Sequence, residues 1–339
     1  MDEVTATFEV IAPAAKPSMQ WVKPALGYAL AGAGLIWVLH DFQLGHLHAL
    51  AANLEWRWIA LAIVFDVMSY VCQGARWRLL MKPLGEVSTL RATQAIYAGL
   101  FTNEILPMRL GELVRAYLVS RWTAAKFVAV IPSMVVERLF DALWLAVGIG
   151  LTAMFVPLPG DLLRAADALG ASVVIAAAVL CYFVLRPPKA QRFSTWPLRF
   201  VSPLLERLPG CLHGMARTRE FYLSLAGSLL LMMFQAMAFW LMMLGCGLHL
   251  SLWIGVAVFL IVHVGTAIPN APANVGSYQF FTVVGLMFFG VDKTVSTGFS
   301  LAVFVLLTLP LLVLGFVALS ASGSSLMKIR REVRNLAHS

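Results

Sequence analysis

Two runs of polar residues interrupt long apolar regions, and the first of them is charged. It extends from Asn103 to Glu112 with the sequence NEILPMRLGE, and Arg115 follows three residues later. Because Arg109, Glu112 and Arg115 are spaced by three, they lie along one face if this segment is helical. The planar guanidinium of Arg109 suits a phosphate group, and Glu112 could hold it in place. Alternatively, Glu112 only complements the positive end of its helix, and Arg115 lies in the lipid headgroup layer.

The second run is polar without being charged. It extends from Pro269 to Gln279 with the sequence PNAPANVGSYQ. Asn274 or Ser277 could cap a helix that begins here, because such side chains accept hydrogen bonds from the free N–H groups at a helix start. The alternative is that Asn274, Ser277 and Gln279 form hydrogen bonds with a lipid headgroup.

Charged residues also lie inside two otherwise apolar segments. Glu137, Arg138 and Asp141 are close in sequence, and offsets of four and three place Asp141 within reach of the other two on one side of a helix. Asp66 is alone in the middle of another segment. Charges inside a bilayer usually face the protein interior or a wet cavity and find partners. Both sets therefore predict either a structural clamp or the lining of a substrate path or proton relay.

The composition indicates which elements must position these residues. Hydrophobic residues make up 60% of the 339 and charged residues 12%, about half of the roughly 25% that soluble domains carry. A soluble protein needs more polar residues to cover its surface, so we expect an all-α integral membrane protein. The net charge is +8, and the basic residues lie between the apolar stretches. That distribution favours contact with anionic lipid over a nucleic-acid partner.

Six apolar segments are long enough to cross a bilayer, which takes about 20 helical residues. They are residues 22–39, 58–75, 127–156, 169–185, 221–245 and 295–320. Residues 91–122 and 253–290 are interrupted midway, so each predicts a re-entrant broken helix pair whose bend is buried in protein or lines a cavity. The predicted hinges, Pro107 with Gly111 and Pro272 with Gly276, share one Pro-x3-Gly spacing, which favours an inverted repeat.

The basic residues predict the orientation of the chain. The expected cytoplasmic segments, 1–23, 76–126, 186–220 and 326–339, hold 21 Lys and Arg, whereas the opposite face holds 3. Cytoplasmic loops carry such an excess, so both termini should be cytoplasmic. The first broken pair would then enter from the cytoplasm and the second from outside. We expect a cytoplasmic segment at 1–21, a membrane domain at 22–322 and a basic tail at 323–339.

Signatures of enzymes and cofactors are scarce. The sequence has no Walker loop, no dinucleotide-binding fingerprint and no nucleophile elbow. The four cysteines are scattered, and His46 and His48 lack a well-spaced third metal ligand. We therefore expect no catalytic residue, no cofactor and no metal site.

The first polar run resembles the signature N-x3-P-x-R-x-G-E-x2-R of one family, the lysylphosphatidylglycerol synthase transmembrane region, also called flippase-like domain proteins. The stretches Arg76–Leu80, Glu137–Asp141 and Pro272–Gln279 fit the same family. The resemblance extends over about residues 22–322, although many members have a glutamate where this chain has Gln279. It implies a bacterial inner-membrane protein that moves lipid between leaflets. The best-known members add a cytoplasmic aminoacyl-transfer domain, which we expect to be missing here, so lysyl transfer is not expected.

We therefore expect a flippase or scramblase-like transporter rather than an enzyme. Its lipid would be an anionic phospholipid, a polyprenyl-phosphate-linked lipid or a hopanoid-type lipid, supplied by a partner enzyme. The headgroup would lie between the N-termini of two half-helices, which favour anions. The expected binding residues are Asn103, Arg109, Glu112, Arg115, Glu137, Arg138, Asp141, Asn274, Ser277 and Gln279. The alternative is a membrane-embedded glycosyl- or acyltransferase, with Glu112, Glu137 or Asp141 as general base.

Overall fold

The structure is a computed structural model that describes part of the chain. The described residues are 22–40, 42, 45, 52–106, 110–123, 125, 127–157, 160, 164, 167–168, 170–171, 175, 218–267 and 271–323. The predicted hinge Pro107 and the predicted phosphate ligand Arg109 lie outside these residues. So do the segment 1–21, most of the predicted span 169–185 and nearly all of the predicted tail.

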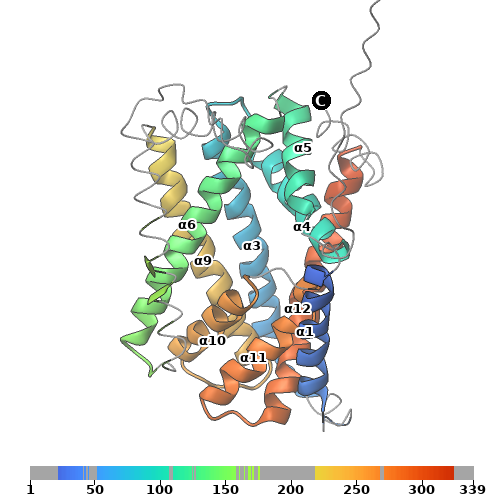
Figure 1. The fold of residues 1–339 in the computed structure, drawn as a ribbon, viewed down its shortest axis with the longest axis vertical. Helices are drawn as coiled ribbons and strands as arrows, with labels where there is room; N and C mark the ends of the chain where they lie inside the picture. The colour runs from blue at the N-terminus through green and yellow to red at the C-terminus, as the bar shows by residue number, and fades with distance from the viewer. Residues whose placement is uncertain are drawn as a thin grey trace, which may run out of the picture.

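The described part of the chain is helical and contains no strand (Figure 1). Its main elements are α1 (Val22–Leu39), α3 (Trp56–Met81), α4 (Thr89–Ile105), α5 (Gly111–Thr123), α6 (Phe127–Ala153), α9 (Arg219–Gly245), α10 (Leu252–Gly265), the 3-10 turn η3 (Pro272–Asn274), α11 (Ser277–Phe288) and α12 (Lys293–Ala321). Among the described residues, α3, α9 and α12 are long and apolar enough to cross a membrane. The predicted all-α membrane class is thus confirmed, whereas the number of spans stays a prediction.

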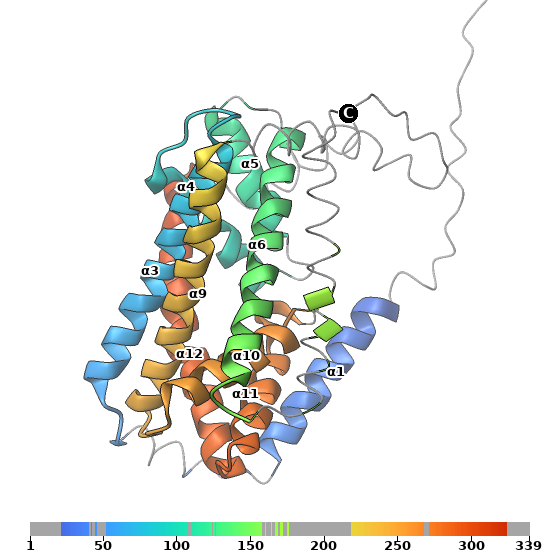
Figure 2. The same cartoon turned by 90° about the vertical axis from the view of Figure 1, so that its left-hand side faces the viewer.

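The helices α3 and α9 form an antiparallel pair at one side of the bundle, and α4, α6, α10 and α12 pack against it (Figure 2). At one end Lys82, just after α3, forms an ion pair with Glu220 in the first turn of α9. At the other end the backbone N–H of Glu55 donates to the carbonyl of Gly245, with an N–O distance of 2.9 Å. Small buried residues, including Ser224 and Ser228 of α9, allow this close packing, as is typical of helix interfaces in membranes.

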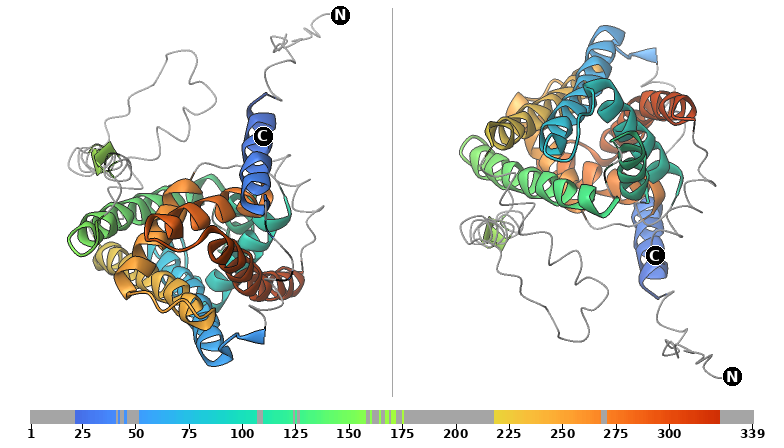
Figure 3. Two further views of the ribbon diagram at one scale, coloured as in Figure 1. Left: turned by 90° about the horizontal axis from the view of Figure 1, so that it is seen from below. Right: turned by 90° about the horizontal axis from the view of Figure 1, so that it is seen from above.

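The two interrupted regions form helix pairs near opposite ends of the α3–α9 pair (Figure 1). The helix α4 ends at Ile105 and α5 begins at Gly111, while α10 ends at Gly265 and α11 begins at Ser277. The contacts of the two pairs correspond, since α4 packs on α3 and α12 while α10 packs on α9 and α6. Seen end-on, α1 lies at the edge of the bundle against α11 (Figure 3). The inverted repeat, and the re-entry of either pair into a bilayer, stay predictions.

A close approach of two glycines determines how the first pair folds back. A Cβ atom on Gly111, the first residue of α5, would overlap the carbonyl oxygen of Gly99 in α4. The Oδ1 atom of Asn103 accepts a hydrogen bond of 2.7 Å from the Gly111 N–H, which satisfies one of the free donors at the start of α5. The structure therefore gives Asn103 a capping role.

The second break differs from the predicted capping. We expected Asn274 or Ser277 to cap the new helix, but the residue at the N-cap of α11 is Gly276, with φ of +87°. A side chain there would be strained and would meet the backbone of Ala31 in α1. The side chain of Gln279 caps instead, because its Oε1 accepts a 2.7 Å hydrogen bond from the Gly276 N–H. The predicted hinge Pro272 begins η3.

Candidate functional site

A cluster of charged side chains joins three helices in the interior of the bundle. It contains Arg76 of α3, Glu112 and Arg115 of α5, and Glu137, Arg138 and Asp141 of α6. Three guanidinium groups face three carboxylates, so these described residues neutralise one another. We call this set the charge cluster. It brings Glu112 and Arg115 of the predicted site together with the three predicted residues of α6.

Arg76 lies at the buried end of the charge cluster. The residue is 1% exposed, and its Nη2 atom lies 3.0 Å from Oε1 of Glu137. Its Nη1 atom pairs with Asp141 and donates a 2.9 Å hydrogen bond to the hydroxyl of Ser228 in α9. A single guanidinium therefore ties α3 to α6 and α9. Arg76 is not among the site residues predicted from the sequence.

Arg115 is also buried, at 3% exposed. Its Nε is 2.7 Å from Oε2 of Glu112, and its Nη1 is 2.8 Å from Oε2 of Glu137. The guanidinium lies 4.9 Å from the ring centre of Trp77, a favourable cation–π arrangement. Trp77 is itself fixed, because its indole N–H donates a 3.0 Å hydrogen bond to Ser133.

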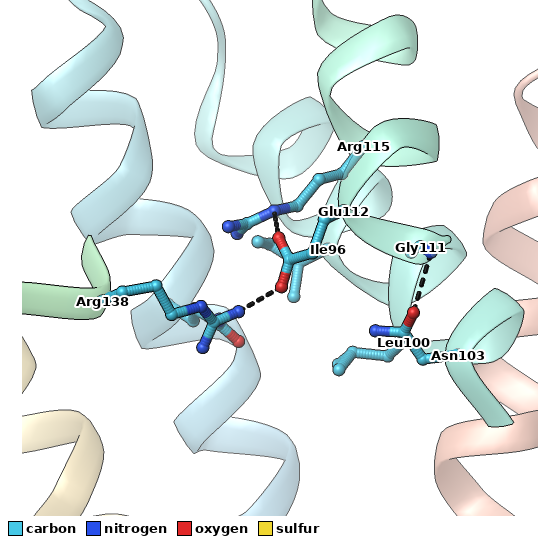
Figure 4. A pocket seen from close by; sticks show the side chains of 9 residues that line it. Ile96, Leu100, Asn103, Gly111, Glu112, Arg115 and Arg138 are labelled. Carbon is cyan, nitrogen blue, oxygen red and sulfur yellow. Dashed lines mark hydrogen bonds and ion pairs between the residues drawn. The ribbon is translucent and has the colours of Figure 1, made fainter. Parts of the chain in front are cut away.

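Arg138 is the most accessible member of the charge cluster. Its side chain is 56% exposed and forms an ion pair with Oε1 of Glu112. A second, longer ion pair of 3.5 Å connects it to Oδ2 of Asp141. Glu112 thus lies between Arg138 and Arg115 (Figure 4), whereas the sequence had suggested Arg109 as its partner.

A small cavity of about 20 Å³, enough for roughly one water molecule, adjoins the charge cluster. It is lined by Gln73, Ile96, Gly99, Leu100, Asn103, Gly111, Glu112, Arg115 and Arg138 (Figure 4). The Nη2 group of Arg115 is buried and has no hydrogen-bond partner among the described residues. Buried donors without partners are rare, so this one marks the cavity as a place where a polar ligand or water would bind.

The other predicted binding residues belong to the second broken pair and not to the cavity. Asn274 is in η3, which packs against α4, and Ser277 and Gln279 are in the first turn of α11. Asn274 has a positive φ of 51°, a conformation that asparagine tolerates better than most residues. The structure therefore does not bring the two predicted halves of the binding site together around the cavity.

The fold and the site together define a class of protein, namely a polytopic helical membrane protein with a neutralised charge cluster in its interior. The chain belongs to the lysylphosphatidylglycerol synthase TM region family, whose model matches residues 24–315. The chain is also similar to the glycosyltransferase AglD of Haloferax volcanii, at 34% identity over 89 residues. That match covers 26% of this chain and 14% of AglD.

Proposed function

We propose that this protein moves an anionic lipid between the two leaflets of a membrane and that the headgroup binds beside Arg138. The observation that carries the proposal is the position of this arginine: it is half-exposed, it borders the cavity, and its carboxylate partner is shared with Arg115. Membership of the family supports a membrane-embedded function. The charge cluster supplies the chemistry that an anionic headgroup requires.

Because Glu112 is shared with Arg115, Arg138 can exchange this carboxylate for another anion at little cost in free energy. A guanidinium that leaves a carboxylate in a poorly solvated site needs another anion, and a phosphate accepts the same two parallel hydrogen bonds. If Arg138 turned to a phosphate, Glu112 would still be paired with Arg115 at 2.7 Å. Neither charge would therefore be left buried without a partner, which is the expensive outcome.

Several finer expectations belong to the same proposal. Arg109, which lies outside the described residues, would receive the headgroup at the first break. Asn274, Ser277 and Gln279 would contact it at the second break when the protein opens toward the other side. The lipid would be an anionic phospholipid, a polyprenyl-phosphate-linked lipid or a hopanoid-type lipid, and a partner enzyme would supply it. We place the protein in a bacterial inner membrane with both termini in the cytoplasm.

The role of Arg138 predicts a selective loss in Arg138→Gln. One charge-assisted hydrogen bond contributes about 1.5–3 kcal/mol, so we expect exchange of a labelled anionic phospholipid between the leaflets of proteoliposomes to fall roughly tenfold to a hundredfold. Arg57→Gln is the matched control, because Arg57 is also an exposed arginine with a carboxylate partner, outside the charge cluster. It should exchange lipid at the wild-type rate.

Folding must be measured alongside exchange for both variants. Because the Arg138 side chain is 56% exposed, we expect Arg138→Gln to elute as a single species and to unfold near the wild-type temperature. A folded Arg138→Gln protein with wild-type exchange would remove this residue from the mechanism.

The second candidate function is a membrane-embedded lipid-modifying enzyme, and the match to a named glycosyltransferase is the observation that favours it. The match covers only 14% of AglD, which is too little to transfer that protein's activity to this chain. In addition, the three acids that could act as general base, Glu112, Glu137 and Asp141, are all held by arginines. A labelled product formed from polyprenyl-phosphate and a sugar donor, without leaflet exchange, would favour the enzyme.

A further inference from the structure

Asp66 is a buried acid that the charge cluster does not use. It lies in the middle of α3 and is 7% exposed. No hydrogen bond or ion pair reaches its carboxyl group from any residue that the structure describes, and only its backbone carbonyl accepts a bond, from the hydroxyl of Ser69 at 2.7 Å. Each acid of the charge cluster, by contrast, has an arginine partner. Asp66 therefore requires a different explanation.

Three tyrosines lie near Asp66, and one of them also lies near a further acid. Tyr70 of α3, Tyr97 of α4 and Tyr278 of α11 are all close enough to interact with it electrostatically, and Tyr70 also interacts with Glu104 of α4. The rings of Tyr70 and Tyr97 are 5.4 Å apart. Tyr97 is 6% exposed, and its hydroxyl has no hydrogen-bond partner among the described residues. An unpaired donor and an unpaired acid thus share one buried site.

No cation from the neighbouring helices compensates Asp66. The helices α9 and α12 carry charges only at their starts, namely Arg219 and Glu220 in α9 and Lys293 in α12. The other described charges on the helices next to α3 are Arg91 and Glu104 of α4, Arg115 of α5, which lies over Trp77, and the three α6 residues of the charge cluster. An isolated ionised carboxylate in such a place costs several kcal/mol, so a carboxyl group there neutralises itself by binding a proton.

We propose that Asp66 is a proton-binding site and that its protonation is coupled to the movement of lipid. The coupling rests on the proposed function, whereas proton binding by itself does not. A proton from water on one side of the membrane would bind the carboxylate and leave to water on the other side. The carboxyl group is neutral while α3, α4 and α11 are packed around it. It ionises when these helices separate and water reaches it, and the Tyr97 hydroxyl then donates the first hydrogen bond to the carboxylate.

The position of Asp66 links its protonation to the shape of the cavity. Gln73, which lines the cavity, is seven residues further along α3, and residues seven apart share one helix face. The helix α4 contributes both Tyr97 and the cavity residues Gly99 and Asn103. A separation of α4 from α3 at Asp66 would therefore also change the cavity beside Arg138.

Infrared spectroscopy tests proton binding without any assay of transport. Purified wild-type protein near neutral pH should show the carbonyl stretch of protonated carboxyl groups, and that band should lose intensity in Asp66→Asn. Asp292→Asn is the matched control, because Asp292 precedes α12 and caps it through the Thr294 N–H; it should retain the band. Identical spectra for wild-type protein and Asp66→Asn would overturn the proposal.

Leaflet exchange across a pH gradient tests the coupling. One pH unit corresponds to a tenfold ratio of proton activity, so a gradient of about one unit should shift the leaflet distribution of an anionic phospholipid by up to about tenfold in the wild type. We expect no shift in Asp66→Asn and a restored shift in Asp66→Glu, which keeps the carboxyl group. Wild-type exchange that ignores the gradient would overturn the coupling and leave the proposed function intact. A wild-type protein that exchanges no lipid would overturn both, and the infrared band would still decide whether Asp66 holds a proton.

Discussion

Arg76→Ala is expected to lower the free energy of unfolding by about 3–5 kcal/mol, the effect of removing one partner from a buried ion pair. Arg76 is 1% exposed and lies between Glu137 and Asp141. Without it, Glu137 retains only Arg115 at 2.8 Å, and Asp141 retains only Arg138 at 3.5 Å. The hydroxyl of Ser228 also loses its donor. Because these partners belong to α6 and α9, the variant should loosen both helices from α3.

The neighbouring Arg78 provides the control for this variant. Arg78 is two residues further along α3, is exposed and donates a long hydrogen bond of 3.4 Å to the hydroxyl of Thr89. Arg78→Ala should change stability by no more than about 0.5 kcal/mol, as surface substitutions usually do. Unfolding of both purified variants in one detergent, followed by circular dichroism against temperature, measures the difference. Equal melting temperatures would show that the buried ion pairs do not hold the three helices together.

The substitution Gly111→Ala is expected to separate the two helices of the first broken pair. The added methyl group would overlap the carbonyl oxygen of Gly99 and lie 2.6 Å from Oδ1 of Asn103. Overpacking of this kind typically costs about 1–3 kcal/mol, and more where backbone must move. The Gly99 carbonyl belongs to the backbone of α4 and cannot rotate away, whereas the Asn103 side chain could turn only by losing its hydrogen bond from the Gly111 N–H. Gly111 and Gly99 also line the cavity, so leaflet exchange should fall together with the melting temperature.

The same substitution at Gly150 separates the overlap from the general effect of replacing glycine in a helix. Gly150 is in α6, and a Cβ atom there would meet nothing within 4 Å. Alanine is the better helix former by about 0.5–1 kcal/mol, so Gly150→Ala should raise the melting temperature. If Gly111→Ala were equally stabilising, the close approach of α4 and α5 would be wrong.

The helices and their breaks could be predicted from the sequence because they depend on local features. Apolar segments of sufficient length predicted α3, α9 and α12, and proline and glycine among polar residues predicted breaks within 91–122 and 253–290. The same reasoning indicated that Asp141 could reach Arg138, and in the structure the two side chains form an ion pair with an N–O distance of 3.5 Å. Both kinds of inference use spacing along one chain segment.

The partners of the charged residues could not be predicted, since they depend on how distant helices pack. Arg76 and Glu137 are 61 positions apart in sequence, and no spacing rule connects them. The signal that could have identified Arg76 was an arginine within the last turns of an apolar span, where it must find a carboxylate. Likewise, the burial of Arg115 follows from α6 and Trp77 packing around it. The capping by Gln279 follows from the positive φ of Gly276, which the sequence does not reveal.

The measurement that tests the central claim most directly is leaflet exchange by the wild-type protein in proteoliposomes. Labelled anionic phospholipid and a zwitterionic phospholipid with the same acyl chains would be compared, with empty vesicles as the baseline. Because the cavity presents Arg138 and the unpaired Nη2 of Arg115, we expect the anionic lipid to exchange roughly ten times faster than the zwitterionic one, as one charge-assisted hydrogen bond would produce. Exchange of anionic lipid no faster than in empty vesicles would contradict lipid transport by this protein.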